Sequence, residues 1–268
     1  MKLVLFLATA AVALVASLGA AAQANAATVT VVHGVPGLTV DVYVNGEPTL
    51  EGFEPGTITD PLELPAGDYE IEIREAGAPA DSEPALSGSA TLEASTDASI
   101  VAHLDEGGAP TLSVFANDVS TIPAGDARVT VRHTAAAPAV DVLADGSPLI
   151  GGLSNPDEAA AEVPAATYSV AVAPAGTTDA VLGPTDLPLE AGTAYAVYAI
   201  GSAEDGTLDL LVQTTTGLGA APAGAPAGDS GLAAAGGGFP SWAIVLMALA
   251  AAGLVGSGLA LARARNDA

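Results

Sequence analysis

The sequence of 268 residues contains no cysteine and very little positive charge. The lack of cysteine excludes a disulfide scaffold, a thiol nucleophile and a zinc site built on thiolates. Six lysine and arginine residues stand against 31 aspartate and glutamate residues, a formal net charge of −25. Nucleic-acid binding needs clustered basic residues to neutralise phosphates. Between residues 27 and 238 the basic residues are Arg74, Arg128 and Arg132 alone, so nucleic acid is excluded as a partner.

Aromatic residues are also scarce, at 4%, yet half of the residues are apolar and the mean hydropathy is +0.48. A hydropathy this high is typical of membrane proteins, whereas a large negative charge is typical of soluble acidic surfaces. The two properties must therefore belong to different stretches of the chain.

Residues 1–26 have the pattern of an export signal peptide. Lys2 precedes an apolar run that extends to about Leu18, and the small residues Ala24-Asn25-Ala26 form a cleavage signal. We expect the mature chain to begin at Ala27.

Residues 239–262 predict one transmembrane helix. Its apolar part, Trp242–Ala262, has 21 residues without a charge, enough at about 1.5 Å per residue to cross a hydrocarbon core of about 30 Å. Arg263 and Arg265 follow directly, so the positive-inside rule places the tail, residues 263–268, in the cytoplasm. The prediction is an exported, single-pass protein of the cell membrane, with its ectodomain outside.

Two features near this helix leave alternatives open. A face of small residues permits close pairing of two helices and hence a homodimer; its members are Ala248, Ala252, Gly256 and Ala260. Leu232–Gly236 resembles a sortase sorting signal, although Ala235 stands where that signal has its threonine. Retention by the membrane helix therefore ranks ahead of covalent attachment to the cell wall.

The region between signal peptide and membrane helix contains the same unit twice. Val29–His33 matches Val129–His133, and Val40-Asp41-Val42 matches Val140-Asp141-Val142, at an offset of 100 residues. Copies of about 95 residues have the size of domains rather than of solenoid repeats. We predict domains at residues 27–126 and 127–216, and a linker rich in Ala, Pro and Gly at residues 217–238.

Within each copy, apolar residues alternate with polar ones. In residues 69–74, Tyr69, Ile71 and Ile73 alternate with charged residues, a pattern typical of a half-buried antiparallel strand. Asn45-Gly46 and Asp145-Gly146 follow such runs and predict tight turns. About seven short strands per copy and no amphipathic helix predict an all-β fold of two tandem immunoglobulin-like β-sandwich domains.

The motifs of the first copy resemble those of the DUF4397 family, a domain of unknown function in exported proteins. They are His33 with Asp41–Gly46, and Leu64–Ile73. The second copy departs from them at Ala135–Pro138 and at Leu143-Ala144. The resemblance implies a β-rich surface protein and no particular reaction.

His33 and His133 recur eight residues before Asp41 and Asp141. A histidine and an aspartate on adjacent strands could serve as ligands or as an acid/base pair. The favoured interpretation is structural, with each histidine holding a loop by hydrogen bonds. A single histidine at this place in each copy, with no second histidine beside it in the sequence, is too few for a transition-metal site.

Acidic turns at residues 105–108 and 204–206 offer oxygen ligands to Ca²⁺, although solvated hairpin loops have the same composition. We expect no cofactor, with Ca²⁺ kept as an alternative.

The function that the sequence favours is that of a non-catalytic cell-surface protein for adhesion, envelope scaffolding or partner binding. The partner would be an extracellular protein or an envelope component. The alternative is a module that binds a small ligand, a glycan or Ca²⁺ through loops at the sandwich ends. An enzyme is not expected. Residues 27–238 carry 30 acidic residues and three arginines, a net charge of −27, so a cationic or metal-bridged partner is favoured.

Overall fold

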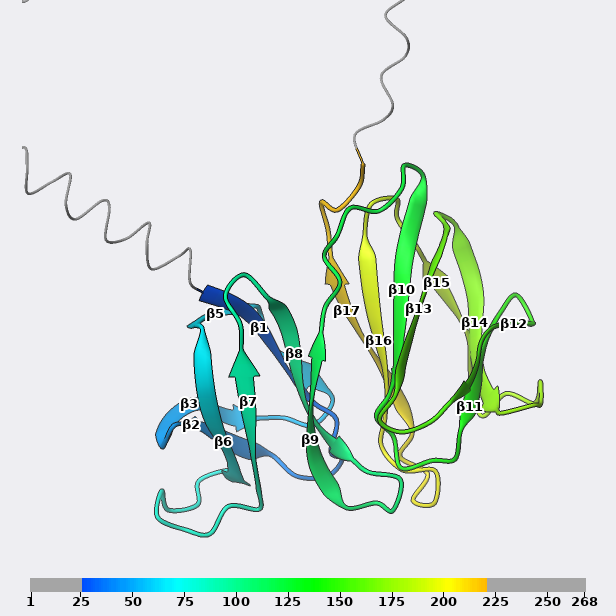
Figure 1. Cartoon of the computed structure of the whole chain (residues 1–268). Coiled ribbons are helices and arrows are strands. Elements are labelled where there is room, and N and C mark those ends of the chain that lie inside the picture. The colour runs from blue at the N-terminus through cyan, green and yellow to red at the C-terminus, as the bar shows by residue number, and fades with distance from the viewer. Residues whose placement is uncertain (1–25, 221–268) are drawn as a thin grey trace, which may run out of the picture. The chain divides into compact units, whose positions relative to one another are not determined.

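The computed structural model describes residues 26–220, and the regular structure of this part of the chain is entirely β (Figure 1). The first copy contains nine strands: β1 (Ala26–His33), β2 (Val40–Val44), β3 (Glu47–Phe53), β4 (Thr57–Ile58), β5 (Leu62–Pro65), β6 (Gly67–Glu75), β7 (Leu86–Leu92), β8 (Asp97–Leu104) and β9 (Pro110–Ala116). The second contains eight: β10 (Asp126–His133), β11 (Val140–Ala144), β12 (Ser147–Leu153), β13 (Glu158–Pro164), β14 (Thr167–Pro174), β15 (Leu182–Pro188), β16 (Ala194–Ile200) and β17 (Asp209–Thr215).

Each copy forms two sheets. In the first copy, β4 and β5 both pair with one side of β1, and β8 pairs with its other side and with β9. The other sheet of this copy has the order β3-β2-β6-β7. The second copy repeats this arrangement, with the orders β13-β10-β16-β17 and β12-β11-β14-β15. Two strand pairs, β1 with β8 and β10 with β16, are parallel, and the other pairs are antiparallel.

The all-β prediction is confirmed, and the paired sheets are consistent with a sandwich in each copy. The strand order, however, is not the immunoglobulin one. In immunoglobulin domains the first two strands lie side by side in one sheet. Here β1 and β2 lie in opposite sheets, and β1 pairs with β8. The alternation of apolar and polar residues indicates which face of a strand is buried. It does not indicate which other strand lies beside that strand in the sheet.

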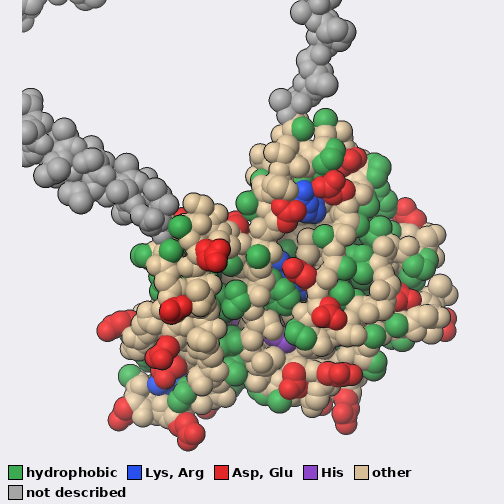
Figure 2. Space-filling model, viewed as in Figure 1, with side chains coloured by type: hydrophobic (Ala, Val, Ile, Leu, Met, Phe, Trp, Pro, Cys, Tyr) green, Lys and Arg blue, Asp and Glu red, His purple; other side chains and the backbone are tan. Residues whose placement is uncertain are grey.

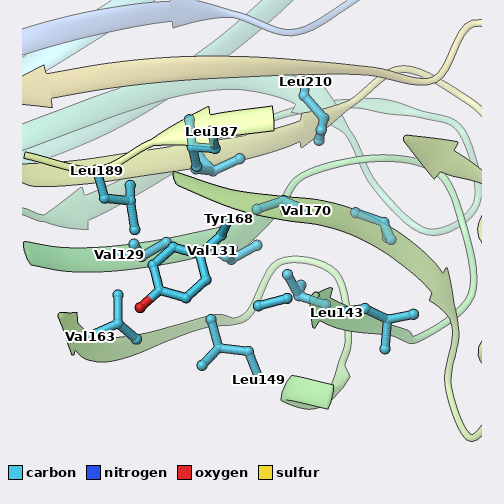
Figure 3. Close-up of a pocket in the computed structure, with 14 residues that line it drawn as sticks. Val129, Val131, Leu143, Leu149, Val163, Tyr168, Val170, Leu187, Leu189 and Leu210 are labelled. Atoms are coloured by element: carbon cyan, nitrogen blue, oxygen red, sulfur yellow. The ribbon is translucent and has the colours of Figure 1, made fainter. Parts of the chain in front are cut away.

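A hydrophobic core fills the space between the two sheets of each copy. In the first copy Val29 and Ile100 of one sheet cluster with Val42, Ile71 and Leu92 of the other. Figure 3 shows the corresponding place in the second copy, where apolar side chains from both sheets converge. The gap left there is about 30 Å³, as is the equivalent gap in the first copy. That is about the volume of one water molecule in the liquid, so these gaps are parts of the core rather than ligand sites.

The two copies differ at one sheet edge. Strand β13 pairs with β10 without interruption from Glu158 to Pro164. Its counterpart in the first copy is split into β4 and β5, with Thr59–Pro61 between them. Pro61 has no N–H to donate to a strand partner, which fits its place just before β5 begins. This break leaves an irregular edge beside the second copy.

Both copies belong to one compact unit. Within residues 26–220, no helix occurs that has the length and apolar character to cross a membrane. The signal peptide up to residue 25, the transmembrane helix, the tail, the sorting-like motif and the small-residue face are predictions that lie outside the described residues. So does the linker from residue 221 onward.

Candidate binding site at the junction of the two copies

Strands β8 and β16 are buried on both faces. Seven of the eight residues of β8 are buried, although a strand at the surface of a sandwich would bury only alternate residues. The inward face of each strand packs into its own core, and the outward faces pack against the other copy. The apolar part of this contact, which we call the junction, joins Val32, Val101 and Phe115 of the first copy to Tyr198 and Ile200 of the second.

Gln213 of β17 makes hydrogen bonds across the junction through both the nitrogen and the oxygen of its side-chain amide. Its Nε2 donates to Thr30 Oγ1 at 3.2 Å, and its Oε1 accepts from Ser99 Oγ at 2.9 Å and from the Tyr198 hydroxyl at 2.6 Å. Burial raises the pKa of Tyr198, so its hydroxyl stays protonated and donates. A partly buried amide with its partners in place favours one arrangement of the two copies, because any slip would leave polar atoms unpaired.

Arg132 lies next to this network and is only 1% exposed. Its Nε is 2.8 Å from Glu158 Oε2, and its Nη1 donates to the Tyr198 hydroxyl at 2.7 Å. The guanidinium also lies over the Phe115 ring of the first copy, 4.7 Å from its centre. A buried charge is tolerated only when it is paired and hydrogen-bonded, and here the second copy supplies the carboxylate and the first copy supplies the aromatic face.

A second polar contact lies at the other end of the junction. Asn155 Nδ2 donates both to the Leu104 carbonyl of the first copy, at 2.8 Å, and to the Ala135 carbonyl of the second, at 2.7 Å. Beside it, buried His103 donates from Nδ1 to the Leu104 carbonyl and accepts at Nε2 from Ser113 Oγ. Burial lowers the pKa of His103, so the imidazole is neutral at pH 7.

At one end the junction opens into a groove of about 570 Å³. One wall is the break between β4 and β5, and the other is β17. Its lining is rich in hydroxyl groups and includes the Gln213 amide and the carboxylates of Asp60 and Asp97; the residues are Thr30, Ile58, Thr59, Asp60, Pro61, Asp97, Val212, Gln213, Thr214, Thr215 and Thr216. Such a surface can hydrogen-bond a polyhydroxylated ligand or attract a cation, and its volume is in the range of small-molecule sites.

The predicted histidines lie away from this groove, at the ends of β1 and β10. His33 Nε2 donates to the Leu38 carbonyl at 2.8 Å, and His133 Nε2 donates to the Pro138 carbonyl at 3.1 Å. Both side chains are buried, and burial lowers the pKa of His33. Each ring therefore holds the loop that carries the chain from one sheet to the other, as the structural interpretation expects.

The predicted aspartates hold hairpins. Asp41 accepts the N–H of Gly52 at 2.7 Å and of Gly77 at 2.9 Å. Asp141 accepts the corresponding N–H groups, of Gly152 and Gly176, each at 2.7 Å. These hydrogen bonds lower the pKa of Asp141. In the described part of the chain no hydrogen bond joins either histidine to its aspartate, so the structure does not bring the four residues together as acid/base pairs.

The acidic turns close on themselves. Asp105 Oδ1 accepts the N–H of Ala109 at 2.8 Å, in the connection between β8 and β9. Among residues 26–220, no three His, Asp or Glu side chains are arranged to hold a metal ion.

The comparisons with known proteins bear on the repeat itself. A sequence model of a family described as a domain of unknown function, DUF4397, matches residues 27–143 and again residues 134–226. The chain belongs to the DUF4397 family. Two tandem matches confirm both the duplication and the resemblance found in the sequence motifs. A search of curated proteins found no match to this DUF4397 chain.

The junction residues were not among the candidates from the sequence. Arg132 counted only as one of few positive charges, and Gln213 lies in a short polar run, Gln213–Thr216. One signal was available: Ala98–Leu104 and Ala194–Ile200 are almost continuously apolar, which is typical of strands buried on both faces.

Proposed function

We propose that this DUF4397 protein is a non-catalytic cell-surface protein whose two copies act together as one acidic body that binds a cationic partner. The partner is an extracellular protein or an envelope component that presents lysine amines. The predicted signal peptide and membrane helix support display outside the cell.

This proposal rests on the burial and pairing of the positively charged side chains. All three arginines of residues 26–220 are buried and paired: Arg74 with Glu72, Arg128 with Glu162, and Arg132 with Glu158. Many acidic side chains, in contrast, are exposed, and Figure 2 shows them spread over the viewed face with little basic surface between them. A surface of one sign attracts partners of the opposite sign and speeds their association.

The composition allows a direct test on intact producing cells with a water-soluble carbodiimide, which joins carboxylates to amines in contact. The chain has one lysine, Lys2, in the predicted signal peptide, so the lysine amine of an adduct must come from the partner. We expect a covalent adduct at about 0.1 M salt whose yield falls at about 1 M, where charges more than about 3 Å apart are screened. No adduct at low salt, or a yield that ignores salt, would contradict the proposal.

Matched variants show which copy the partner contacts. Residues 28–126 carry 18 acidic residues and one arginine, whereas residues 127–218 carry 11 and two. We expect the adduct to be lost when Gln replaces four exposed acids of the first copy, Glu47, Glu51, Glu54 and Glu83. It should persist when amides replace four exposed acids of the second copy, Asp179, Asp186, Glu190 and Glu204. The reverse pattern would contradict binding by the more acidic copy.

The groove supports a second candidate function, the binding of a glycan or Ca²⁺. Its threonine hydroxyls and the carboxylates of Asp60 and Asp97 favour this function, with the ligand at the junction rather than in the sandwich-end loops. A ligand that binds only the folded state raises the melting temperature. We expect Ca²⁺ or an oligosaccharide panel to raise it for the native protein and less for Asp60→Asn. A panel without any shift would leave partner binding as the only candidate.

A further inference from the structure

The two copies fill the same place in the sandwich differently. In the first copy Val35, Leu38 and Phe53 pack against the core, next to the loop that follows His33. The offset of 100 residues puts Ala135, Pro138 and Leu153 at these positions in the second copy. The strand registers agree with this correspondence, because Val40 pairs with Phe53 and Val140 pairs with Leu153. The second copy therefore has smaller side chains at positions where the first copy has larger apolar ones.

A cavity of about 130 Å³ lies at this end of the second copy. Its inner wall consists of buried residues, among them His133, Ala135, Val140, Val172 and Ala199. Its rim consists of exposed ones, Pro138, Val181 and Ala203. Val181 is 52% exposed, one of the few large apolar side chains of the described part that face solvent. The cavity thus has a mainly apolar interior and an apolar entrance.

The lining determines what kind of ligand fits. None of the residues that line this cavity is an aspartate, glutamate, lysine or arginine. The one titratable side chain, His133, has its Nε2 engaged by the Pro138 carbonyl at 3.1 Å and its Nδ1 facing the Ala135 N–H at 3.4 Å. A charged or strongly polar ligand would lose its hydration there without compensation. The ligand must be apolar and uncharged.

We propose that the second copy binds a compact, uncharged apolar molecule in this cavity, in the place that Val35 and Leu38 occupy in the first copy. Its size follows from the volume, because an apolar protein cavity of about 150 Å³ binds benzene or xenon. The proposal is independent of the acidic surface and of the junction groove. The proposal also gives the second copy a ligand site that the first copy lacks. In the first copy, the protein's own apolar side chains occupy the corresponding place.

Fluorobenzene is a suitable probe, because ¹⁹F NMR reports its binding to the purified full-length chain. The variant Ala135→Val with Pro138→Leu places the side chains of the first copy in the cavity. We expect saturable binding to the native protein and at least about tenfold weaker binding to this variant, about 1.4 kcal/mol. Partition of the probe into detergent or lipid is the same for both proteins, so the difference between them isolates the cavity.

The matched control makes the same two replacements elsewhere. Pro79→Leu with Ala80→Val changes two exposed loop residues of the first copy and should leave fluorobenzene binding unchanged. Ala135→Val alone keeps Pro138 and should also weaken binding, which preserves the test if circular dichroism shows that the double variant is unfolded. Equal binding to the native and filled proteins, or no saturable binding to the native protein, would overturn the proposal.

Discussion

Tyr198 is the residue on which the polar part of the junction converges. Its hydroxyl accepts from Arg132 and donates to Gln213. Tyr198→Phe leaves a guanidinium N–H of the buried Arg132 without this partner, which costs about 1–3 kcal/mol. We expect the free energy of unfolding, measured in urea by circular dichroism, to fall by this amount.

Tyr168→Phe is the matched control. The Tyr168 hydroxyl donates to the exposed Pro164 carbonyl, which water can satisfy, so we expect a change within about 0.5 kcal/mol. Equal losses in the two variants would mean that the junction network has no special role in stability.

The buried histidines make stability depend on pH. Burial lowers the pKa of His33 and His103 below the ordinary value of 6.5, so the unfolded chain binds protons at these sites before the folded chain does. Their contribution is therefore complete above pH 6.5 and is lost as the pH falls through the lower, folded values. We expect a smaller free energy of unfolding at pH 5.5 than at pH 7.5.

The carboxylates act in a different pH range. Hydrogen bonds lower the pKa of Asp118 and Asp141 below the ordinary 3.8, so their contribution to stability is lost only in stronger acid.

His33→Gln combined with His103→Gln should flatten the pH dependence of the free energy of unfolding between pH 7.5 and 5.5. A native profile that is level or rises with acidification in this range would contradict the assignment of neutral, buried imidazoles.

At the scale of the elements, Asp41 and Asp141 hold the hairpins of the two copies in the same way. Asp141→Asn replaces one of the two acceptor oxygens with an amide nitrogen that faces a backbone N–H. We expect faster hydrogen exchange at the amides of Gly152 and Gly176, measured by NMR, because local opening there becomes easier. Asp186→Asn, on an exposed residue of β15, should leave both rates unchanged. Unchanged rates in Asp141→Asn would show that the carboxylate does not hold these turns.

The strand that the sequence predicts at residues 69–74 lies within β6, which alternates from Tyr69 to Ile73. In β7 and β15 the alternation of large apolar residues with polar ones is weaker. Strand β15 is mostly exposed and contains Gly183-Pro184, and β7 contains Ser87, Gly88 and Ser89. Such strands are held by their neighbours in the sheet rather than by their own pattern.

Strand order and the junction depend on contacts between distant residues. The parallel pairing of β1 with β8 joins residues about 70 positions apart, such as Val31 and Ile100. The structural roles of His33 and His133 followed from their position at strand ends. The role of Gln213 did not, because it depends on Thr30 and Ser99 of the other copy. Sequence periodicity reports burial, and it does not report which surfaces meet.

At the scale of the whole molecule, the duplication has produced one body with two specialised halves. The first copy carries most of the negative charge, and the second supplies Arg132 and Gln213 to the junction. If the copies keep one fixed arrangement, a partner meets a single acidic surface and the groove keeps its shape. The fixed arrangement of the two copies is therefore the central claim.

The absence of native cysteine makes this claim directly measurable. Spin labels at Ser87→Cys and Thr185→Cys, both exposed strand positions in different copies, report the distance between the copies by pulsed electron resonance. The pair Ser147→Cys and Thr185→Cys, within one sheet of the second copy, gives the width expected for a rigid body. We predict a single distance distribution across the junction that is as narrow as this reference. A broad or multiple distribution would show that the two copies move independently and would contradict the account.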